Sequence, residues 1–235
     1  MKIVFLTGAG ASKESGLRTF RDCDDGMWNE YKIEDVASID GWKQDREQVI
    51  EFYGIRNAEC SKAEPNDTHK FIAELEKDHE VVVITQNVDD LHERAGSTNV
   101  IHVHGSLYEA RSTLDPKLIY TLEELGIEDG YIKVGTKCEK GSQLRPNIVW
   151  FHELPHRLQE SYNHVYTADL YVVVGTSFAV STASNITAFL QKSTPSIIVD
   201  PGEIGGEVEK TFNHHIKEIG STGVKKIFDY VKEII

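Results

Sequence analysis

Short apolar runs recur along the chain and are rich in Val and Ile. They cover residues 3–6, 81–84, 100–104, 147–151, 170–174 and 196–200. Continuous apolar runs of this length are typical of strands that are buried on both faces of a parallel sheet. We therefore predict a sheet that occupies the centre of the molecule.

The segments between these runs have apolar residues at helical spacing. We predict helices over about 45–61, 68–77, 157–166 and 183–192. A C-terminal helix has one apolar stripe, formed by Val224, Ile227, Phe228, Val231 and Ile234. The alternation predicts an α/β fold, a Rossmann-like open parallel sheet with helices on both faces.

Residues 111–146 differ in character from the rest of the chain. A helical pattern over 116–125 is closed by Gly126 and followed by short polar loops. We predict that this segment is a smaller inserted module outside the main sheet.

Composition narrows the classes of partner. The 235 residues have a net charge of -13 and are 40% hydrophobic, which argues against nucleic acid as a partner. No apolar run approaches the ~20 residues of a membrane span, so we expect no membrane partner.

The three cysteines, Cys23, Cys60 and Cys138, include no C-x-x-C pair and favour a reducing, cytoplasmic location. The oligomeric state is unknown from the sequence.

The stretch from Gly8 to Asp22 follows the first apolar run directly. A Gly-x-Gly turn between a strand and a helix can present backbone N–H groups to a phosphate. The spacing is not the dehydrogenase fingerprint, because Lys13 replaces its third glycine, and it is not a P-loop. An ordinary tight turn explains Gly8 and Gly10, but it does not explain the polar continuation through Arg21.

Polar residues also follow the other apolar runs, where open parallel sheets bind ligands. They are Thr85–Asp89, His104, Gly175–Ser177 and Asp200. Each has a simpler explanation, since Asn87 and Asp89 are plausible caps of a short helix that Gly96 ends. Together they predict one shared crevice.

These stretches, in order, resemble the motifs of sirtuins, the NAD-dependent protein lysine deacylases. The matching residues are Gly8–Gly16 with Thr19–Arg21, Thr85–Asp89 with Leu91, His92, Ala95 and Gly96, His104–Ser106, Arg145 and Pro146 with Val149–Phe151, and Gly175–Ser177. The resemblance implies one catalytic domain over 1–235. Its large part would cover about 1–32, 78–110 and 147–235, with a helical small-domain segment at about 33–77 and the insertion at about 111–146.

The resemblance implies an NAD site at the carboxyl ends of the strands. The implied cofactor-binding residues are Gly8, Ala9, Gly10, Ser12, Phe20, Arg21, Gln86, Asn87, Asp89, Gly175, Thr176, Ser177 and Asp200. His104 matches the catalytic histidine and would act as general base on a ribose hydroxyl, with Asn87 and Asp89 beside it. His102 lies on the same face if its strand is regular, but the family's histidine directly precedes a glycine.

The implied substrate is an acylated lysine in a protein or peptide, bound as an added strand. Val149 and Phe151 would line the acyl-lysine channel. Tyr53 and Arg56 resemble the Tyr-x-x-Arg pair of sirtuins that remove succinyl and other acidic acyl groups, since a guanidinium grips a carboxylate in two places. A surface arginine beside a half-buried tyrosine is the simpler alternative.

The chain departs from the family in its insertion. Most sirtuins hold zinc there with four cysteines, whereas this segment has Ser112 at the first position and only Cys138 after it. One thiolate cannot build a structural zinc site, so we predict no zinc. We expect apolar packing instead, from Leu114, Leu118, Ile119, Leu122, Leu125, Ile127 and Ile132.

Three smaller departures are Ala11, Arg18 and His152, where isoleucine, proline and glycine are common. Two other functions remain open at this point. One is an NAD hydrolase or ADP-ribosyltransferase that uses the same site, and the other is a non-catalytic NAD-binding module.

Overall fold

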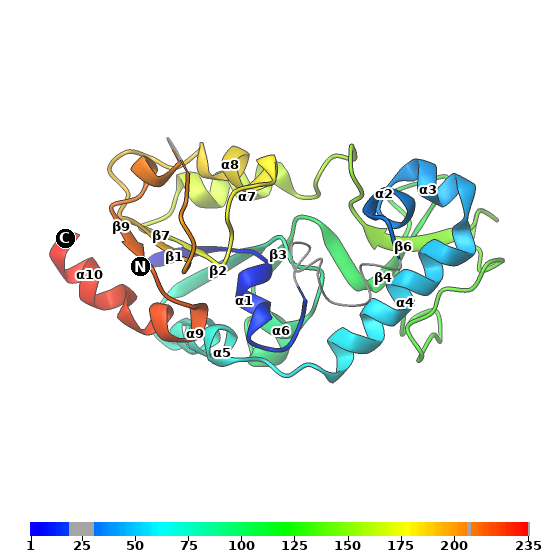
Figure 1. Cartoon of the computed structure of the whole chain (residues 1–235), viewed down its shortest axis with the longest axis horizontal. Helices are drawn as coiled ribbons and strands as arrows, with labels where there is room; N and C mark the ends of the chain where they lie inside the picture. The colour runs from blue at the N-terminus through cyan, green and yellow to red at the C-terminus, as the bar shows by residue number, and fades with distance from the viewer. Residues whose placement is uncertain (19–30, 206–207, 235) are drawn as a thin grey trace.

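The larger lobe is built on a six-stranded sheet, shown in a computed structural model that describes residues 1–18, 31–205 and 208–234 (Figure 1). All neighbouring strands in this sheet are parallel. Their order across it is β3 (Val100–His102), β2 (Glu80–Thr85), β1 (Lys2–Thr7), β7 (Leu170–Val174), β8 (Ser196–Val199) and β9 (His214–Ile216). The strand order reverses beside β1, which makes the β1–β7 edge the switch point where such sheets bind ligands.

Helices cover both faces of this sheet, and each face has its own apolar core. One core joins Phe5, Val83 and Val172 to Ala11, Ile72 and Ile227, and the other joins Leu6, Ile84 and Val173 to Val165 and Ile186. In Figure 1, α7 (Leu158–Tyr166) and α8 (Ser181–Thr187) lie on one side. The opposite side carries α1 (Ala9–Lys13), α5 (Asp67–Glu74), α6 (Leu91–Ala95), α9 (Gly220–Gly223) and α10 (Ile227–Ile234). Alternate side chains of a strand point to opposite faces, so the uniformly apolar strands feed both cores.

The smaller lobe combines helices with an antiparallel sheet. Its strands are β5 (Ile119–Thr121), β4 (Gly105–Ser112) and β6 (Leu144–Ile148), and its helices are α2 (Ile33–Val36), α3 (Ile39–Gln44) and α4 (Arg46–Lys62). Asp45 caps α4, because its carboxylate accepts a hydrogen bond from the Gln48 backbone N–H. The buried faces of Phe52, Trp42 and Trp150 pack these elements together. The described residues also include the short 3-10 turns η1 (Leu75–Lys77), η2 (Glu209–Thr211) and η3 (Val224–Lys226).

The predicted Rossmann-like sheet and the separate small module are confirmed, but two predicted elements are wrong. Residues 116–125 are not a helix, because β5 at its centre pairs with β4 in the register Ala110↔Tyr120. The predicted strand over 147–151 ends at Ile148 and belongs to the small sheet. Strands β4 and β9 were not expected, since neither is a continuous apolar run.

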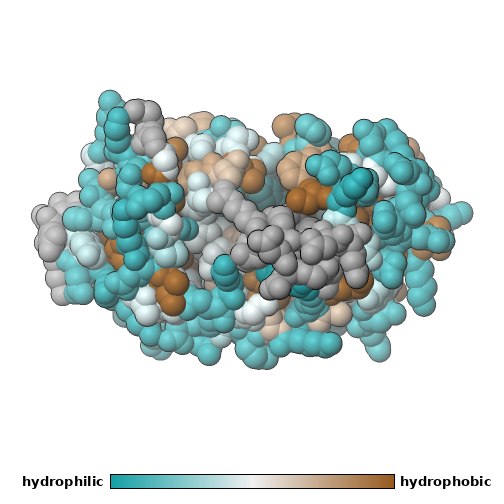
Figure 2. Space-filling view, viewed as in Figure 1, coloured by the Kyte–Doolittle hydropathy of each residue, from teal (hydrophilic) through white to brown (hydrophobic). Residues whose placement is uncertain are grey.

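The outer surface is mainly polar. In the view of Figure 2, hydrophobic residues form separate patches on a largely hydrophilic surface. No helix within residues 1–18, 31–205 and 208–234 is both long and apolar enough to cross a membrane. The exposed apolar side chains include Phe151, Leu154 and Val180, which follow β6 and β7.

Candidate functional site

The β1–α1 turn meets the end of β7 by direct backbone contact. The Gly8 N–H donates to the Val174 carbonyl (3.0 Å), and the Gly10 N–H donates to the Gly175 carbonyl (2.9 Å). A Cβ added to Gly10 would lie 2.7 Å from the Gly175 Cα, closer than side chains approach backbone. Gly175 itself has a φ of 65°, in the left-handed region that favours glycine. The glycines are therefore required by a close crossing of the backbone at the switch point.

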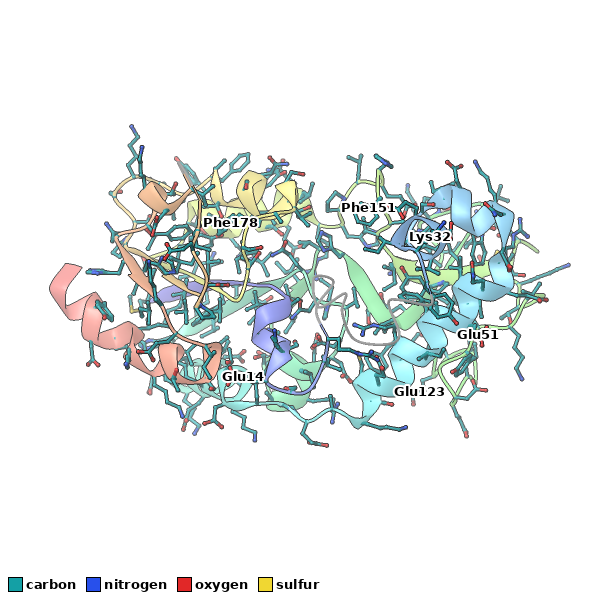
Figure 3. All side chains as sticks on the ribbon, in the orientation of Figure 1. Glu14, Lys32, Glu51, Glu123, Phe151 and Phe178 are labelled. Carbon is teal, nitrogen blue, oxygen red and sulfur yellow. The ribbon has the colours of Figure 1, made fainter. Side chains whose placement is uncertain are left out.

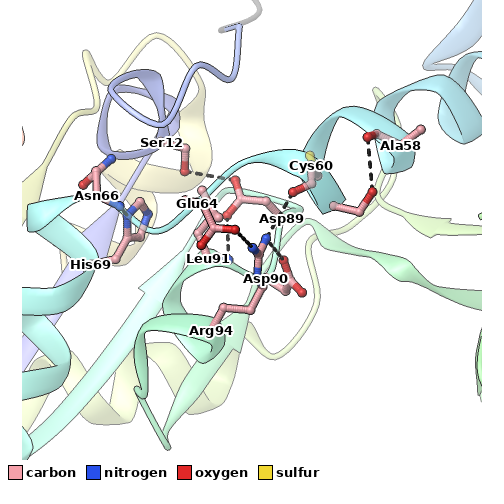
Figure 4. A network of polar contacts seen from close by, with 11 residues as sticks. Ser12, Ala58, Cys60, Glu64, Asn66, His69, Asp89, Asp90, Leu91 and Arg94 are labelled. Carbon is pink, nitrogen blue, oxygen red and sulfur yellow. Dashed lines mark hydrogen bonds and ion pairs between the residues drawn. The ribbon is translucent and has the colours of Figure 1, made fainter.

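A buried polar chain lies beneath this turn. The Asn87 side-chain amide donates to the Gly8 carbonyl (3.0 Å) and to Ser12 Oγ (2.9 Å). Ser12 Oγ in turn donates to Asp89 Oδ2 (3.0 Å), as Figure 4 shows. Burial raises the pKa of Asp89. These three residues connect the loops after β1 and β2, so the structure brings together residues that the sequence predicted in one crevice.

The capping role considered for two of these residues is only partly correct. Helix α6 begins at Leu91, with Asp90 at its N-cap position. The Asp89 carboxylate does accept from the Leu91 N–H (3.2 Å), but the Asn87 side chain faces Gly8 and Ser12 instead. Gly96 ends the helix in the left-handed conformation, as predicted.

His104 stands at the opening of the same crevice with both ring nitrogens in hydrogen bonds. Nδ1 lies 3.1 Å from the Gln86 carbonyl, which can only accept, so Nδ1 carries the proton. Nε2 then accepts from the Thr182 hydroxyl at 3.3 Å. Burial lowers the pKa of His104, which keeps the ring neutral at pH 7. The ring thus presents an unprotonated Nε2, the form that a general base requires.

His102 has different surroundings, although its ring is also hydrogen-bonded to a backbone carbonyl. Strand β3 ends at His102, and its Nε2 lies 2.7 Å from Glu93 Oε1. Burial lowers the pKa of His102, but the hydrogen bond and charge of Glu93 outweigh burial and raise it. His102 is therefore paired with a carboxylate, whereas the ring of His104 is hydrogen-bonded to two neutral groups, the Gln86 carbonyl and the Thr182 hydroxyl.

The remaining predicted cofactor residues differ in their surroundings. Gln86 belongs to the crevice, since its side-chain amide donates to Thr176 Oγ1 (3.2 Å) across the switch point. Ala9 begins α1, and Ser177 follows Thr176 in the loop after β7. The Asp200 carboxylate accepts from the Gly202 N–H (2.8 Å) and so closes its own turn. Phe20 and Arg21 lie outside the described residues.

The predicted channel residues lie between His104 and helix α4. The Val149 N–H donates to the His104 carbonyl (2.9 Å), which fixes Val149 beside the histidine. Next along the chain, Trp150 Nε1 donates to the Tyr53 hydroxyl (3.0 Å), and burial raises the pKa of Tyr53. Phe151 is 52% exposed, on the loop between the lobes near Lys32 in Figure 3.

Arg56 lies one turn after Tyr53 on α4 and is almost buried. Its guanidinium pairs with Glu59 Oε2 at 3.1 Å, and Arg18 pairs with the other oxygen of Glu59 at 2.7 Å. The sequence reading missed this carboxylate, although its spacing from Arg56 is that of a helical ion pair. It also missed Thr182, for which the sequence offers no comparable pattern.

Serine and cysteine side chains meet in the small lobe, where zinc was considered. Ser112 Oγ and Ser142 Oγ are 2.7 Å apart, and Cys138 Sγ lies 3.5 Å and 3.3 Å from them. Hydrogen bonds from the two serines lower the pKa of Cys138 to about 7. Within the part of the chain that the structure describes, no three His, Cys, Asp or Glu residues are placed to hold a metal. One thiol and two hydroxyls do not fit a structural zinc site. That the protein binds no zinc remains a prediction.

Apolar packing surrounds this cluster as expected, with two exceptions. Leu122 and Ile132 are buried with Cys138 and Leu144, and further predicted residues pack against them, namely Leu118, Leu125 and Ile127. Leu114 and Ile119 are exposed instead, so their predicted contribution is wrong.

The fold and site define a class of protein, an enzyme that binds a dinucleotide at the switch point of a parallel sheet and presents a neutral histidine beside it. The Sir2 family profile matches residues 8–182. The chain belongs to the Sir2 family.

Relatives and solved structures agree with this assignment over almost the whole chain. An NAD-dependent protein deacylase of Bacteroides thetaiotaomicron is 39% identical over 225 residues, covering 96% of this chain and 95% of the relative. One from Helicobacter pylori is 43% identical over 199 residues, covering 85% of this chain and 84% of the relative. The crystal structure of a Sir2 homologue–NAD complex aligns with a TM-score of 0.84 and 36% identity, covering 99% of this chain and 90% of the other.

Proposed function

We propose that this chain removes acyl groups from lysine side chains of proteins and consumes NAD as co-substrate, releasing nicotinamide and O-acyl-ADP-ribose. The enzyme class follows from its family and its relatives, and the chain is an NAD-dependent protein deacylase. The observation that carries the proposal is the neutral, Nδ1-protonated His104 at the mouth of the crevice.

The residues of the crevice suit a dinucleotide. Gly8, Ala9, Gly10 and Ser12 would receive the diphosphate, because they form the turn from β1 into the N-terminus of α1, a position that favours phosphate. Gln86, Asn87 and Asp89 would surround the nicotinamide ribose, where bound NAD supplies an electrophilic sugar carbon. Gly175, Thr176, Ser177 and Asp200 would lie along the adenosine half. Phe20 and Arg21 are assigned on the family resemblance alone.

Buried polar contacts support the catalytic roles that we assign to Asn87 and Asp89. Asn87 is 8% exposed and Asp89 is 6% exposed, and both are held by Ser12. Their remaining hydrogen-bonding capacity can orient a ribose and a water molecule without reorganisation. His104 Nε2, which accepts from Thr182, would exchange that partner for a ribose hydroxyl and take its proton.

The substrate peptide would lie along the loops after β6 and β7, where Phe151, Leu154 and Val180 are exposed. The acyl-lysine would pass Val149 and Phe151 toward His104. We assign Tyr53 and Arg56 to the end of the acyl chain, which extends the activity from acetyl to succinyl and malonyl groups. A guanidinium such as that of Arg56 can bind a terminal carboxylate through two hydrogen bonds, and the Tyr53 hydroxyl accepts a hydrogen bond from Trp150.

The proposal also includes a domain division and a cellular location. We propose that the two lobes are the large and the small part of one catalytic domain, and β4 begins the small sheet at Gly105. A cytoplasmic location would suit Cys60 and Cys138, both free thiols.

The test is an assay of nicotinamide and acyl-ADP-ribose release with NAD, in the presence and absence of an acyl-lysine peptide. Peptide-dependent release is expected, and His104→Ala is expected to lower turnover about 100-fold or more. His102→Ala is the matched control and should retain most turnover.

Other outcomes would contradict the proposal. Peptide-independent release of nicotinamide would indicate an NAD hydrolase, and binding of NAD without turnover would indicate a non-catalytic module. Turnover that survives His104→Ala but not His102→Ala would overturn the assignment of the general base.

A further inference from the structure

The His104 ring is held at both of its nitrogen atoms by groups from two different parts of the large lobe. Nδ1 donates to the Gln86 carbonyl (3.1 Å), in the loop after β2, and Nε2 accepts from Thr182 Oγ1 (3.3 Å), near the start of α8. Contacts at two positions of a ring restrict both of its side-chain torsion angles. The orientation of the ring therefore depends on the Thr182 hydroxyl as well as on the main chain.

Thr182 is itself held in place by the packing of its helix. The residue is 5% exposed, and Ala183 and Ile186 of the same helix are fully buried in one of the two cores of the large lobe. Within residues 1–18, 31–205 and 208–234, the Thr182 hydroxyl has His104 Nε2 as its hydrogen-bond partner. A β-branched side chain is stiff at χ1, whereas the hydroxyl proton can rotate about the Cβ–Oγ bond. The oxygen is thus fixed at Nε2, and its proton is free to turn.

We propose that Thr182 is a positioning residue for the deacylation reaction, because its hydroxyl can serve His104 Nε2 in both protonation states of the ring. In the empty site the hydroxyl donates to the unprotonated Nε2 and holds the ring in its reactive orientation. After proton transfer the same oxygen accepts from the Nε2–H group. This inference rests on the proposed role of His104 as the general base.

Proton transfer reverses the direction of the hydrogen bond at Nε2. The O–H bond of the ribose hydroxyl breaks and an N–H bond forms at Nε2, while the electron pair of the broken bond stays on the ribose oxygen, which can then attack the acyl carbon. Both ring nitrogens now carry protons, and Nδ1 already has the Gln86 carbonyl as its acceptor. A hydroxyl has one proton and two lone pairs, so Thr182 can turn its proton away and accept from Nε2–H. The partly buried imidazolium then has an acceptor at each nitrogen.

Thr182→Val removes this hydroxyl and keeps the shape of the side chain. We expect kcat for an acetyl-lysine peptide to fall about tenfold, because a hydrogen bond to a charged group is worth about that factor. The KM values for NAD and for the peptide should be nearly unchanged, because Thr182 contacts the base and not the substrates. Thr182→Ser keeps the hydroxyl and should retain most of the wild-type kcat.

Thr187→Val is the matched control, because it makes the same change further along the same helix. Thr187 is also 5% exposed, and its hydroxyl is hydrogen-bonded to the Tyr171 hydroxyl (2.9 Å) instead of to the site. This variant should lose thermal stability and keep the wild-type kcat. Should Thr182→Val fail to fold, Thr182→Ala lacks the same hydroxyl and takes its place in the comparison with Thr182→Ser.

Nitrogen-15 NMR of the histidine rings in NAD-free protein measures the contact without any turnover. The His104 signals are assigned by their absence from the spectrum of His104→Ala. We expect the Nε2 resonance to move to higher frequency in Thr182→Val, because the nitrogen loses its hydrogen-bond donor, while Nδ1 stays protonated. Thr182→Ser and Thr187→Val should leave both resonances near their wild-type positions.

The outcomes separate this inference from the proposed function. If the wild type has no peptide-dependent turnover, or if His104→Ala retains it, the proposed base is wrong and the inference is overturned with it. If His104→Ala removes turnover but Thr182→Val has the same kcat as Thr187→Val, only the positioning role is overturned. A loss of kcat that Thr182→Ser shares, or a change confined to KM, would also overturn it. A fall in kcat without the hydroxyl, recovered in Thr182→Ser and accompanied by the shift of the Nε2 resonance, would support it.

Discussion

The proposed dinucleotide crevice and the serine–cysteine cluster of the small lobe are both groups of polar contacts surrounded by apolar side chains. The contacts that form them differ in kind. The crevice depends on backbone approaching backbone, at Gly8, Gly10 and Gly175. The cluster depends on side-chain hydroxyls, since Ser112 Oγ contacts both Ser142 and Cys138. Backbone geometry cannot be repaired by a neighbouring side chain, whereas hydroxyl contacts can be replaced. We therefore expect the crevice to tolerate change far less than the cluster.

The largest expected effect comes from Gly10→Ala. The added Cβ would lie 2.7 Å from the Gly175 Cα, and neither backbone segment can move without breaking the Gly10–Gly175 hydrogen bond. We expect a loss of about 2 to 3 kcal/mol in the free energy of unfolding, together with loss of NAD binding. Thermal unfolding and titration with NAD measure the two effects.

Gly205→Ala is the matched control for this change, because nothing lies within 4 Å of an added Cβ there. The comparison fails if Gly10→Ala and Gly205→Ala have similar stability and similar affinity for NAD.

The second largest effect is expected from low pH, which should lower the free energy of unfolding through two histidines of the large lobe. His69 and His92 stack edge to face at 4.7 Å, and burial lowers the pKa of His69 to about 4 and that of His92 well below its usual value. Unfolding lets both rings bind protons near pH 6.5, so the unfolded state gains protons as the pH falls. Stability is therefore full above pH 6.5 and is lost below it, by about 2 kcal/mol for His69 alone between pH 8 and pH 5.

Denaturant unfolding at several pH values tests this dependence. His69→Gln should reduce the loss of stability between pH 8 and pH 5, whereas His152→Gln, at an exposed position, should leave it unchanged. A wild-type free energy of unfolding that is constant from pH 8 to pH 5 would contradict the prediction.

The smallest effect is expected from Ser112→Ala. Ser112 Oγ accepts from the backbone N–H groups of Leu114 and Asp115 and contacts Ser142 and Cys138. Loss of these contacts should cost about 1 to 2 kcal/mol of stability, because two backbone N–H groups lose their acceptor, and deacylation should change little. Thermal unfolding and the deacylation assay measure the two.

The exposed Lys137→Ala serves as a control from the same loop. Elemental analysis of the purified protein completes the comparison, because about one zinc per chain would show that metal, and not the hydroxyl cluster, holds this end of the small lobe.

The fold could be predicted from the sequence where a local pattern favours a single structure, such as a continuous apolar run that forms a buried strand. The apolar strands β1, β2, β7 and β8 and the glycines between them predicted the sheet and the place of its crevice. The prediction failed in the small lobe, where β5 consists of only Ile119–Thr121 and owes its conformation to pairing with β4. Short-range pattern favoured a helix there, and tertiary pairing overrode it.

The site was predicted less completely than the fold. The residues that we propose to bind NAD follow strands and so could be predicted, but the residues that contact them do not follow strands. Thr182 reaches His104 from the start of α8, and Arg18 reaches Glu59 from another lobe segment. Such contacts depend on how the elements pack, which one sequence does not reveal.

The hydrogen bond from His104 Nδ1 to the Gln86 carbonyl limits which substitutions can change the orientation of the His104 ring. The acceptor is a main-chain atom, so no substitution at position 86 removes it unless the loop itself moves. The position of the proton on the His104 ring is therefore insensitive to substitution at position 86. Gln86 can change its side chain, and with it the contact to Thr176, while the base keeps its orientation. The Gln86 side chain can therefore vary while the main-chain carbonyl of the same residue holds the His104 ring in place.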